Sequence, residues 1–170
     1  MTTDTLPEKP PATQALPVPP TLPTALAQAI EARGYTSLTP VQAAVTAAEA
    51  LGRDLLVSAQ TGSGKTVAFG LAMAAELLGD AATLPPPGRP MALVIAPTRE
   101  LALQVASELG WLYAGARGRI ATCVGGMNQA QERRALSAGA HIVVGTPGRL
   151  RDHLERGALL LDQLKVAVLD

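Results

Sequence analysis

The sequence predicts an α/β fold, a mostly parallel β-sheet with helices on both faces. Short apolar runs alternate along the chain with segments of helical periodicity, which is the pattern of successive strand and helix units. Three of these runs, residues 93–95, 142–144 and 166–169, are apolar at every position. Strands that are covered on both faces have this composition, because none of their side chains meets solvent.

The first half of the chain begins with a proline-rich segment. Residues 1–20 contain six prolines and no apolar periodicity, so we expect a disordered tail there. Apolar residues at helical spacing then start at Leu22 and stop at Gly34, a typical helix-ending residue. Pro40 suits the first position of a second helix. The elements predicted from there are a helix, a strand and a helix, at residues 40–51, 54–57 and 65–78.

The second half of the chain repeats a strand and helix unit three times and ends on a strand. A flexible connection rich in proline and glycine, residues 85–88, precedes it. Thr98 and Thr146 stand where helix N-caps are expected, and Pro147 suits a first helical position. The expected strands are residues 92–96, 119–124, 141–144 and 165–169, and the expected helices are residues 99–113, 128–137 and 147–155.

Composition indicates one globular domain. Hydrophobic residues make up 48% of the 170 residues and charged residues 16%, which is typical of a chain with a packed core. Cys123 is the only cysteine, which excludes an internal disulfide and suits a reducing, cytoplasmic location. The chain shows neither a secretory signal pattern nor an apolar stretch long enough for a bilayer, so we expect no membrane partner.

Charge and aromatic content limit how the chain can bind a nucleic acid. Fourteen basic residues balance fourteen acidic ones, so a contact must come from a local cluster of charge. Only 2% of the residues are aromatic, too few for a platform on which bases stack. We therefore expect any nucleic acid to be held by its backbone, without regard to base sequence.

Residues 58–66, with the sequence SAQTGSGKT, predict a phosphate-binding loop. They follow a strand candidate and open a helix, which is the context that such a loop requires. Gly62 and Gly64 allow a tight turn whose amides point inward, and Lys65 can reach the outer phosphates of a nucleotide. The Thr66 hydroxyl can ligate Mg²⁺. The alternative is an ordinary glycine-rich turn with a solvated lysine.

Several strings of this chain together resemble the DEAD-box family of ATP-dependent RNA helicases. The residues PTRELA at 97–102 and TPGRL at 146–150 are more specific than the phosphate loop, which many ATPases share. The strings that carry the resemblance, in the order and at the spacing of the family, are residues 34–42, 59–66, 97–104, 125–126, 146–150 and 168–170. The resemblance covers the chain from about residue 22 onward and implies a RecA-like P-loop domain.

The resemblance implies an ATP site with Mg²⁺. Gln42 would hydrogen-bond the adenine edge, although Thr39 and Gln42 also have the spacing of a helix capping box. Lys65 and Asp170 would be the catalytic residues, and Thr66 and Asp170 would hold Mg²⁺. The residues implied to bind ATP are Gln42, Ala59, Gln60, Thr61, Gly62, Ser63, Gly64, Lys65 and Thr66.

The resemblance also implies an RNA face where the strands end. Thr98 and Thr146 precede helices there, and helix N-termini bind phosphate oxygens. Gly126 allows close approach of the backbone, while Arg99 and Arg149 supply charge. The residues implied to bind the RNA backbone are Pro97, Thr98, Arg99, Gly125, Gly126, Thr146, Pro147, Gly148 and Arg149. The alternative to an RNA face is that Thr98 and Thr146 only cap helices and that Arg99 and Arg149 are solvated surface residues.

Two departures from the family pattern change what we expect. The family usually has an aromatic residue where this chain has Pro17, so we expect weak selectivity for adenine. Asp170 stands where the Asp-Glu-Ala-Asp tetrad begins, so we expect residues 21–170 to form a first RecA-like domain, incomplete at its C-terminus. A second RecA-like domain with arginine fingers would be the missing partner.

The resemblance thus implies an ATP-dependent RNA helicase, which couples ATP hydrolysis to the remodelling of RNA duplexes. We expect these 170 residues alone to bind ATP and the RNA backbone, to hydrolyse ATP very slowly and not to unwind. A small-molecule kinase would have no use for residues 97–102 and 146–150. Residues 34–42 disfavour a related DNA helicase, and a non-enzymatic nucleotide-binding fragment is a class that the sequence leaves open.

Overall fold

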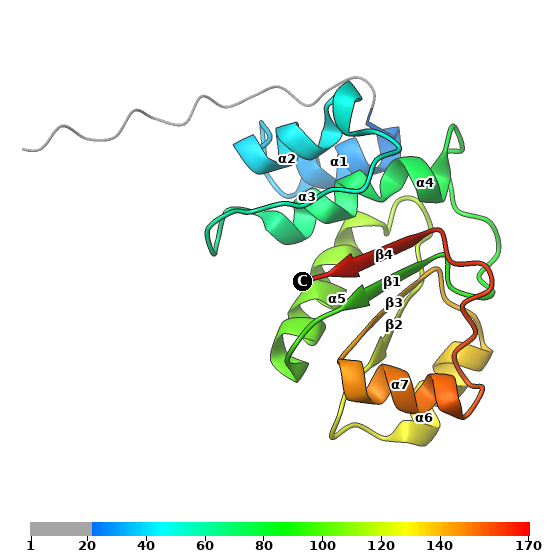
Figure 1. Ribbon diagram of the computed structural model, residues 1–170. Coiled ribbons are helices and arrows are strands. Elements are labelled where there is room, and N and C mark those ends of the chain that lie inside the picture. The colour runs from blue at the N-terminus through cyan, green and yellow to red at the C-terminus, as the bar shows by residue number, and fades with distance from the viewer. Residues whose placement is uncertain (1–21) are drawn as a thin grey trace, which may run out of the picture.

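The computed structural model describes residues 22–170, which form a four-stranded parallel sheet flanked by helices (Figure 1). The expected tail at residues 1–20 and Pro17 lie outside the described residues. The strands are β1 (Ala92–Ile95), β2 (Ile120–Cys123), β3 (Ile142–Gly145) and β4 (Val166–Leu169). They lie in the order β2-β3-β1-β4, and every pair is parallel. The predicted parallel sheet is confirmed.

Helices cover both faces of this sheet, as the apolar runs predict. The helices are α1 (Thr24–Ala32), α2 (Pro40–Thr46), α3 (Lys65–Ala72), α4 (Ala74–Leu78), α5 (Arg99–Leu112), α6 (Gln129–Ser137) and α7 (Pro147–Glu155). Val94 and Val144 face a core that α1, α3, α4 and α5 share, whereas Leu93 and Val143 face a smaller core under α6 and α7. Figure 1 shows α5 and α7 on opposite sides of the sheet. None of these described helices has the length and apolar character to cross a membrane.

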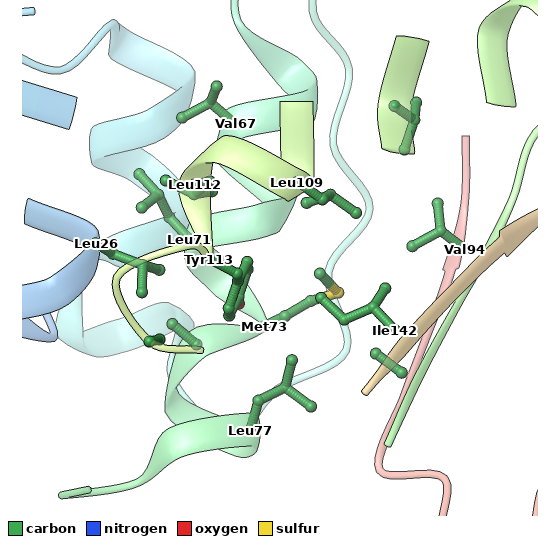
Figure 2. Close-up of a cluster of buried hydrophobic side chains, with 14 of the residues drawn as sticks. Leu26, Val67, Leu71, Met73, Leu77, Val94, Leu109, Leu112, Tyr113 and Ile142 are labelled. Carbon is green, nitrogen blue, oxygen red and sulfur yellow. The ribbon is translucent and has the colours of Figure 1, made fainter. Parts of the chain in front are cut away.

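The larger core is built by the close packing of α3 on α5 (Figure 2). A Cβ atom on Gly70 would lie 2.7 Å from a methyl group of Leu112, so a larger residue there would require the Leu112 side chain to shift. The buried Tyr113 hydroxyl donates a 2.7 Å hydrogen bond to the Gly70 carbonyl. This contact joins α3, which follows the phosphate loop, to the end of α5 beside the sheet.

The expected strand at residues 54–57 is not present, and that prediction is wrong. Leu56 is fully exposed, and Leu55 and Val57 are each exposed by about two fifths. A strand exists only where a neighbour takes up its backbone hydrogen bonds. Within residues 22–170, β4 pairs with β1 alone, and no strand pairs with residues 54–57. The apolar composition of this segment is therefore not sufficient to make it a strand.

Two predicted helices are shorter or interrupted, and the remaining elements are confirmed within two residues. The helix expected at 40–51 ends at Thr46 and continues as the short 3₁₀ helix η1 (Ala48–Ala50). Ala47 is extended there, with φ −65° and ψ 149°, which breaks the helical path. The helix expected at 65–78 is divided at Met73 into α3 and α4.

A buried histidine anchors the connection that precedes β1. The Nδ1 atom of His141 accepts the Arg119 backbone N–H at 2.9 Å. Because Nδ1 accepts, the proton of a neutral ring is on Nε2, which lies 2.7 Å from the Pro85 carbonyl and donates to it. One ring at the start of β3 thus holds both the start of β2 and the connection at residues 85–88.

Candidate nucleotide and RNA site at the rim of the sheet

The phosphate loop has the turn that its glycines predict. Gly62 and Gly64 have φ values of +81° and +84°, a backbone region that residues with side chains rarely adopt. The turn is closed by the Ser63 N–H, which donates to the Gln60 carbonyl at 3.2 Å. Gly64 is the N-cap of α3, so Lys65 is the first helical residue. The loop therefore ends at a helix N-terminus, where backbone N–H groups are free to bind an anion.

Gln42 lies against this loop. Its Nε2 donates to the Gly64 carbonyl at 3.3 Å, and its Oε1 accepts the Thr39 backbone N–H at 3.0 Å. The second of these bonds is one half of the predicted capping box. A Cβ atom on Gly64 would overlap Gln42 Nε2. Gln42 thus links the N-terminus of α2 to the phosphate loop, and its role toward adenine remains a prediction.

The surroundings of the loop fit a phosphate-bearing ligand. The hydroxyl oxygen of Ser63 is buried and has no hydrogen-bond partner among residues 22–170, whereas the hydroxyl of Thr39 faces the Gln42 backbone N–H in the capping box. Buried hydroxyls without partners are uncommon in folded proteins and are compatible with a ligand that supplies the missing bonds. Thr39 and Ser63 also border a cavity of about 1020 Å³, together with Ala59 and Gln60. Gln42, Lys65 and Thr66 do not line this cavity, so it adjoins the phosphate loop without enclosing the residues predicted to hold the phosphates.

Asp170 makes no hydrogen bond or ion pair with the phosphate loop within residues 22–170. Its backbone N–H donates to the Ile95 carbonyl at 2.9 Å, which continues the pairing of β4 with β1. Lys65 and Thr66 are neighbours at the start of α3. No hydrogen bond or ion pair between the described residues joins the Asp170 carboxylate to either of them. The catalytic and metal-binding roles of these three residues therefore remain predictions.

Two of the strings predicted to face RNA meet where β1 and β2 end. Thr98 caps α5, since its Oγ1 accepts the Leu101 N–H at 3.2 Å. The Arg99 guanidinium donates to the Gly125 carbonyl at 3.4 Å. Gly126 has φ +78°, and a Cβ atom there would lie 2.6 Å from Arg99 Nη1. The side chain of Arg99 thus covers the glycine turn instead of extending freely into solvent.

The third string, at the start of α7, lies on the other side of the same turn. The Thr146 N–H donates to the Cys123 carbonyl at 3.0 Å, and Pro147 and Gly148 are exposed in the first turn of α7. Thr146 occupies the N-cap position but its side chain makes no capping hydrogen bond. Arg149 donates to the Met127 carbonyl at 3.4 Å. Together with Pro97, which is exposed after β1, all residues predicted to bind RNA lie in loops or helix starts at one rim.

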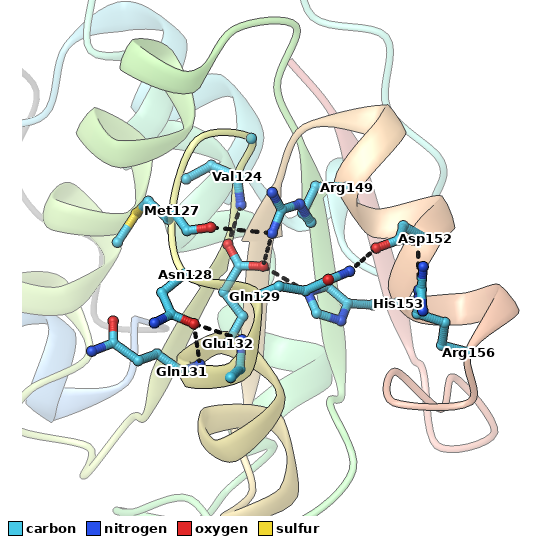
Figure 3. A network of polar contacts seen from close by, with 12 residues as sticks. Val124, Met127, Asn128, Gln129, Gln131, Glu132, Arg149, Asp152, His153 and Arg156 are labelled. Carbon is cyan, nitrogen blue, oxygen red and sulfur yellow. Dashed lines mark hydrogen bonds and ion pairs between the residues drawn. The ribbon is translucent and has the colours of Figure 1, made fainter.

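A buried carboxylate that the sequence did not predict joins these elements (Figure 3). Glu132 is 5% exposed, and its Oε1 accepts the Val124 N–H at 2.8 Å. Its Oε2 accepts from Arg149 Nη1 at 3.0 Å and lies 2.6 Å from His153 Nε2. A carboxylate can only accept, so Nε2 of the fully buried His153 carries a proton and donates. In the sequence Glu132 stands in a polar helical segment and resembles a solvated residue.

The thiol of Cys123 lies close to the same carboxylate. One ligand atom each from Cys123, Glu132 and His153 lies within 4.8 Å of the others. Burial, assisted by the charge of Glu132, raises the pKa of the Cys123 thiol to about 12. Metals bind the thiolate, and the Glu132 oxygens already accept three hydrogen bonds. The donor set therefore does not suit a metal ion, and we interpret it as a structural network.

Comparison with known proteins agrees with this arrangement. The chain is 46% identical over 138 residues to the ATP-dependent RNA helicase DbpA of Escherichia coli K12, which covers 81% of this chain and 29% of DbpA. It is 43% identical over 150 residues to the ATP-dependent RNA helicase DeaD of Haemophilus influenzae, which covers 88% of this chain and 24% of DeaD. The chain thus spans less than a third of the length of these relatives.

The same fold occurs in a solved structure. The crystal structure of the yeast DEAD-box splicing factor Prp28 superposes on 92% of this chain and 38% of that chain, with a TM-score of 0.78 and 32% sequence identity. The RecA-like fold implied by the sequence is therefore confirmed. The family model described as DEAD/DEAH box helicase matches residues 39–170, which include the phosphate loop and every string at the rim. The chain belongs to the DEAD/DEAH box helicase family.

Proposed function

We propose that these residues form the nucleotide- and RNA-binding first domain of an ATP-dependent RNA helicase. The observation that carries the proposal is the turn at Gly62 and Gly64, which ends at a helix N-terminus beside the Ser63 hydroxyl, unpartnered among residues 22–170. Relatives that carry the name ATP-dependent RNA helicase support ATP and RNA as ligands. Because the chain spans less than a third of those relatives, hydrolysis and duplex remodelling are proposed for the whole protein.

At the nucleotide, the chain's own residues would bind and orient the phosphates. The backbone N–H groups of residues 60–66 and the Lys65 ammonium group would hold the β- and γ-phosphates. The Thr66 hydroxyl and the Asp170 carboxylate would hold Mg²⁺, which neutralises part of the phosphate charge when it is bound. Gln42, already in contact with Gly64, would place its amide at the adenine edge. Positioning and charge stabilisation are the main contributions that a phosphate loop makes to hydrolysis.

At the RNA, the rim formed by residues 97–99, 125–126 and 146–149 would hold phosphate groups of one strand. The exposed first turns of α5 and α7 offer backbone N–H groups, and Arg99 adds a cation over the glycine turn. The rim offers few aromatic side chains for stacking on bases. The proposed contact is therefore with the backbone and does not depend on base sequence.

The nucleotide part is tested by calorimetry with Mg·ATP. Lys65→Ala removes the cation of the loop, and a charge-assisted contact of this kind is worth about 1.5–3 kcal/mol, so we expect an affinity loss of about tenfold or more. Lys165→Ala is the matched control, because it removes the same charge at an exposed residue next to β4. Equal affinities of wild type and Lys65→Ala would refute the nucleotide site.

The RNA part is tested by fluorescence anisotropy with poly-U and poly-A at low salt. Arg99→Ala should weaken binding of both polymers alike and make the salt dependence less steep. Arg133→Ala, on the exposed side of α6, is the control with the same charge change and should leave binding unchanged. A loss confined to one polymer would indicate base readout and contradict a backbone site.

A further inference from the structure

Three elements of the rim meet at one carboxylate. Glu132 projects from α6 and accepts from the Val124 N–H at the end of β2, directly before the glycine turn at residues 125–126. Its other oxygen accepts from Arg149 and His153, both on α7 (Figure 3). The Glu132 side chain is only 4% exposed. The carboxylate thus joins α6, β2 and α7 from within.

Arg149 is held by this network and by Met127, the residue that follows the glycine turn, at the same time. Its side chain is 18% exposed, and the same Nη1 that pairs with Glu132 also donates to the Met127 carbonyl at 3.4 Å. The titratable groups that face Glu132 are Arg149, His153 and the thiol of Cys123. A buried carboxylate requires such partners, and loss of one partner of a buried pair is costly.

We propose that Glu132 is a positioning residue of the RNA rim. By holding Val124 and Arg149 together, it sets the distance between the glycine turn at 125–126 and the exposed first turn of α7. RNA phosphates spaced along one strand can contact both turns only when this distance is maintained. The inference rests on the proposed function, because it assigns Glu132 a role in RNA binding without any contact between Glu132 and RNA.

The positioning proposal and simple electrostatics predict changes of opposite sign in RNA affinity when the Glu132 carboxylate is removed. Glu132 adds a negative charge beside a surface proposed to bind a polyanion, so its removal should strengthen RNA binding if charge alone mattered. The positioning role predicts weaker binding, because the turn and α7 would separate. The sign of the change in affinity therefore decides between the two.

The experiment compares Glu132→Gln and Glu132→Asp with wild type for binding of poly-U at low salt. Glutamine has one acceptor oxygen where Glu132 uses two, and aspartate keeps the charge but has a shorter reach. We expect both variants to lose about three- to tenfold in RNA affinity, with Mg·ATP affinity unchanged. Glu155→Gln is the matched control, because Glu155 is an exposed residue of α7 with the same charge. Unchanged or tighter RNA binding by both Glu132 variants would overturn the proposal.

Two further readouts separate positioning from a general loss of structure. The loss caused by Glu132→Gln should largely disappear in an Arg149→Ala background, and full additivity would contradict coupling through Arg149. In nuclear magnetic resonance spectra without RNA, Glu132→Gln should shift the Gly125 and Gly126 amide signals and speed hydrogen exchange at Val124, whereas Glu155→Gln should not. Unshifted glycine signals would refute the positioning role. If the glycine signals shift but the wild-type protein binds no RNA, the proposed function is refuted, while the structural link that Glu132 makes between Val124 and Arg149 is supported.

Discussion

The guanidinium group of Arg99 occupies the space that a side chain on Gly126 would need. The two residues come from different strand ends, and the Arg99 side chain also donates to the neighbouring Gly125 carbonyl. The first turn of α5 and the turn after β2 are thus held together across the rim. This contact involves residues that we propose to bind RNA, so its loss should be visible in RNA binding.

Gly126→Ala should weaken RNA binding by about tenfold. The new methyl group would lie 2.6 Å from Arg99 Nη1, and alanine is also strained at φ +78°. Gly110→Ala is the control, because Gly110 lies in α5 outside the rim, a Cβ atom on it meets nothing within 4 Å and it lacks a positive φ. Anisotropy measurements with poly-U check the pair, and equal losses for both variants would argue against a role for the Arg99 contact.

Gly64→Ala should reduce Mg·ATP affinity more than Gly62→Ala does. Both glycines have positive φ values, so alanine is strained at either position by about 1 kcal/mol. Only at Gly64 would the methyl group also overlap the amide of Gln42. Calorimetry should therefore rank the variants in this order. Addition of Gln42→Ala to Gly64→Ala should remove the overlap. The double variant should therefore regain part of the free energy of unfolding that the overlap in Gly64→Ala costs.

Tyr113→Phe should lower the free energy of unfolding by about 1–2 kcal/mol, the usual cost of an unsatisfied buried hydrogen-bonding group. The hydroxyl donates to the Gly70 carbonyl at 2.7 Å in the core between α3 and α5. Burial also raises the pKa of this hydroxyl, so it remains a donor at physiological pH. Urea unfolding measures the loss, and Tyr35→Phe, at an exposed tyrosine, should cause almost none.

The buried thiol of Cys123 should make the protein lose stability at alkaline pH. Its pKa is raised from the usual 9.0 to about 12 by burial and by Glu132. Between these values the unfolded chain releases the proton while the native protein retains it. The contribution of the protonated Cys123 thiol to the free energy of unfolding is therefore complete below pH 9. It decreases as the pH rises, by at most about 1.4 kcal/mol per pH unit.

Urea unfolding at pH 8, 9 and 10 checks the prediction for Cys123. Wild type should lose more stability over this range than Cys123→Ala, which has no thiol to titrate. Tyr113 titrates in both proteins, so its contribution cancels in the comparison. Parallel pH profiles would show that the thiol does not affect alkaline stability.

The sequence predicted most elements because their signals are local. The helix at residues 147–155 was predicted with its observed bounds, since Pro147 favours its start and Gly157 follows its end. The strand at 54–57 could not be judged in this way. Its apolar residues satisfy the composition of a strand, but composition does not say whether a neighbouring strand is present to pair with it.

The placement of the candidate site residues at one rim was predicted to a similar extent, whereas their binding roles stay predictions. Strings that follow the strands gather at one rim because parallel strands all end on the same side of a sheet, and the contact between Arg99 and Gly126 follows from this rule. Glu132 was missed, because a single acidic residue in a polar helix gives no signal of burial. Its partners Val124, Arg149 and His153 are brought to it only by tertiary packing.

The segment that precedes the phosphate loop, residues 54–57, pairs with no strand among the described residues, and this has a consequence for how nucleotide binding can be measured. The backbone N–H groups of residues 54–57 have no partner within the described part of the chain, whereas Val94 pairs on both sides in the middle of the sheet. Amides of the first kind exchange with solvent rapidly, and those of the second kind exchange slowly. A nucleotide held by the loop would restrict this segment and would give up part of its binding free energy to order it. Deuterium uptake at residues 54–57 would then report occupancy of the loop, while uptake at Val94 would stay constant.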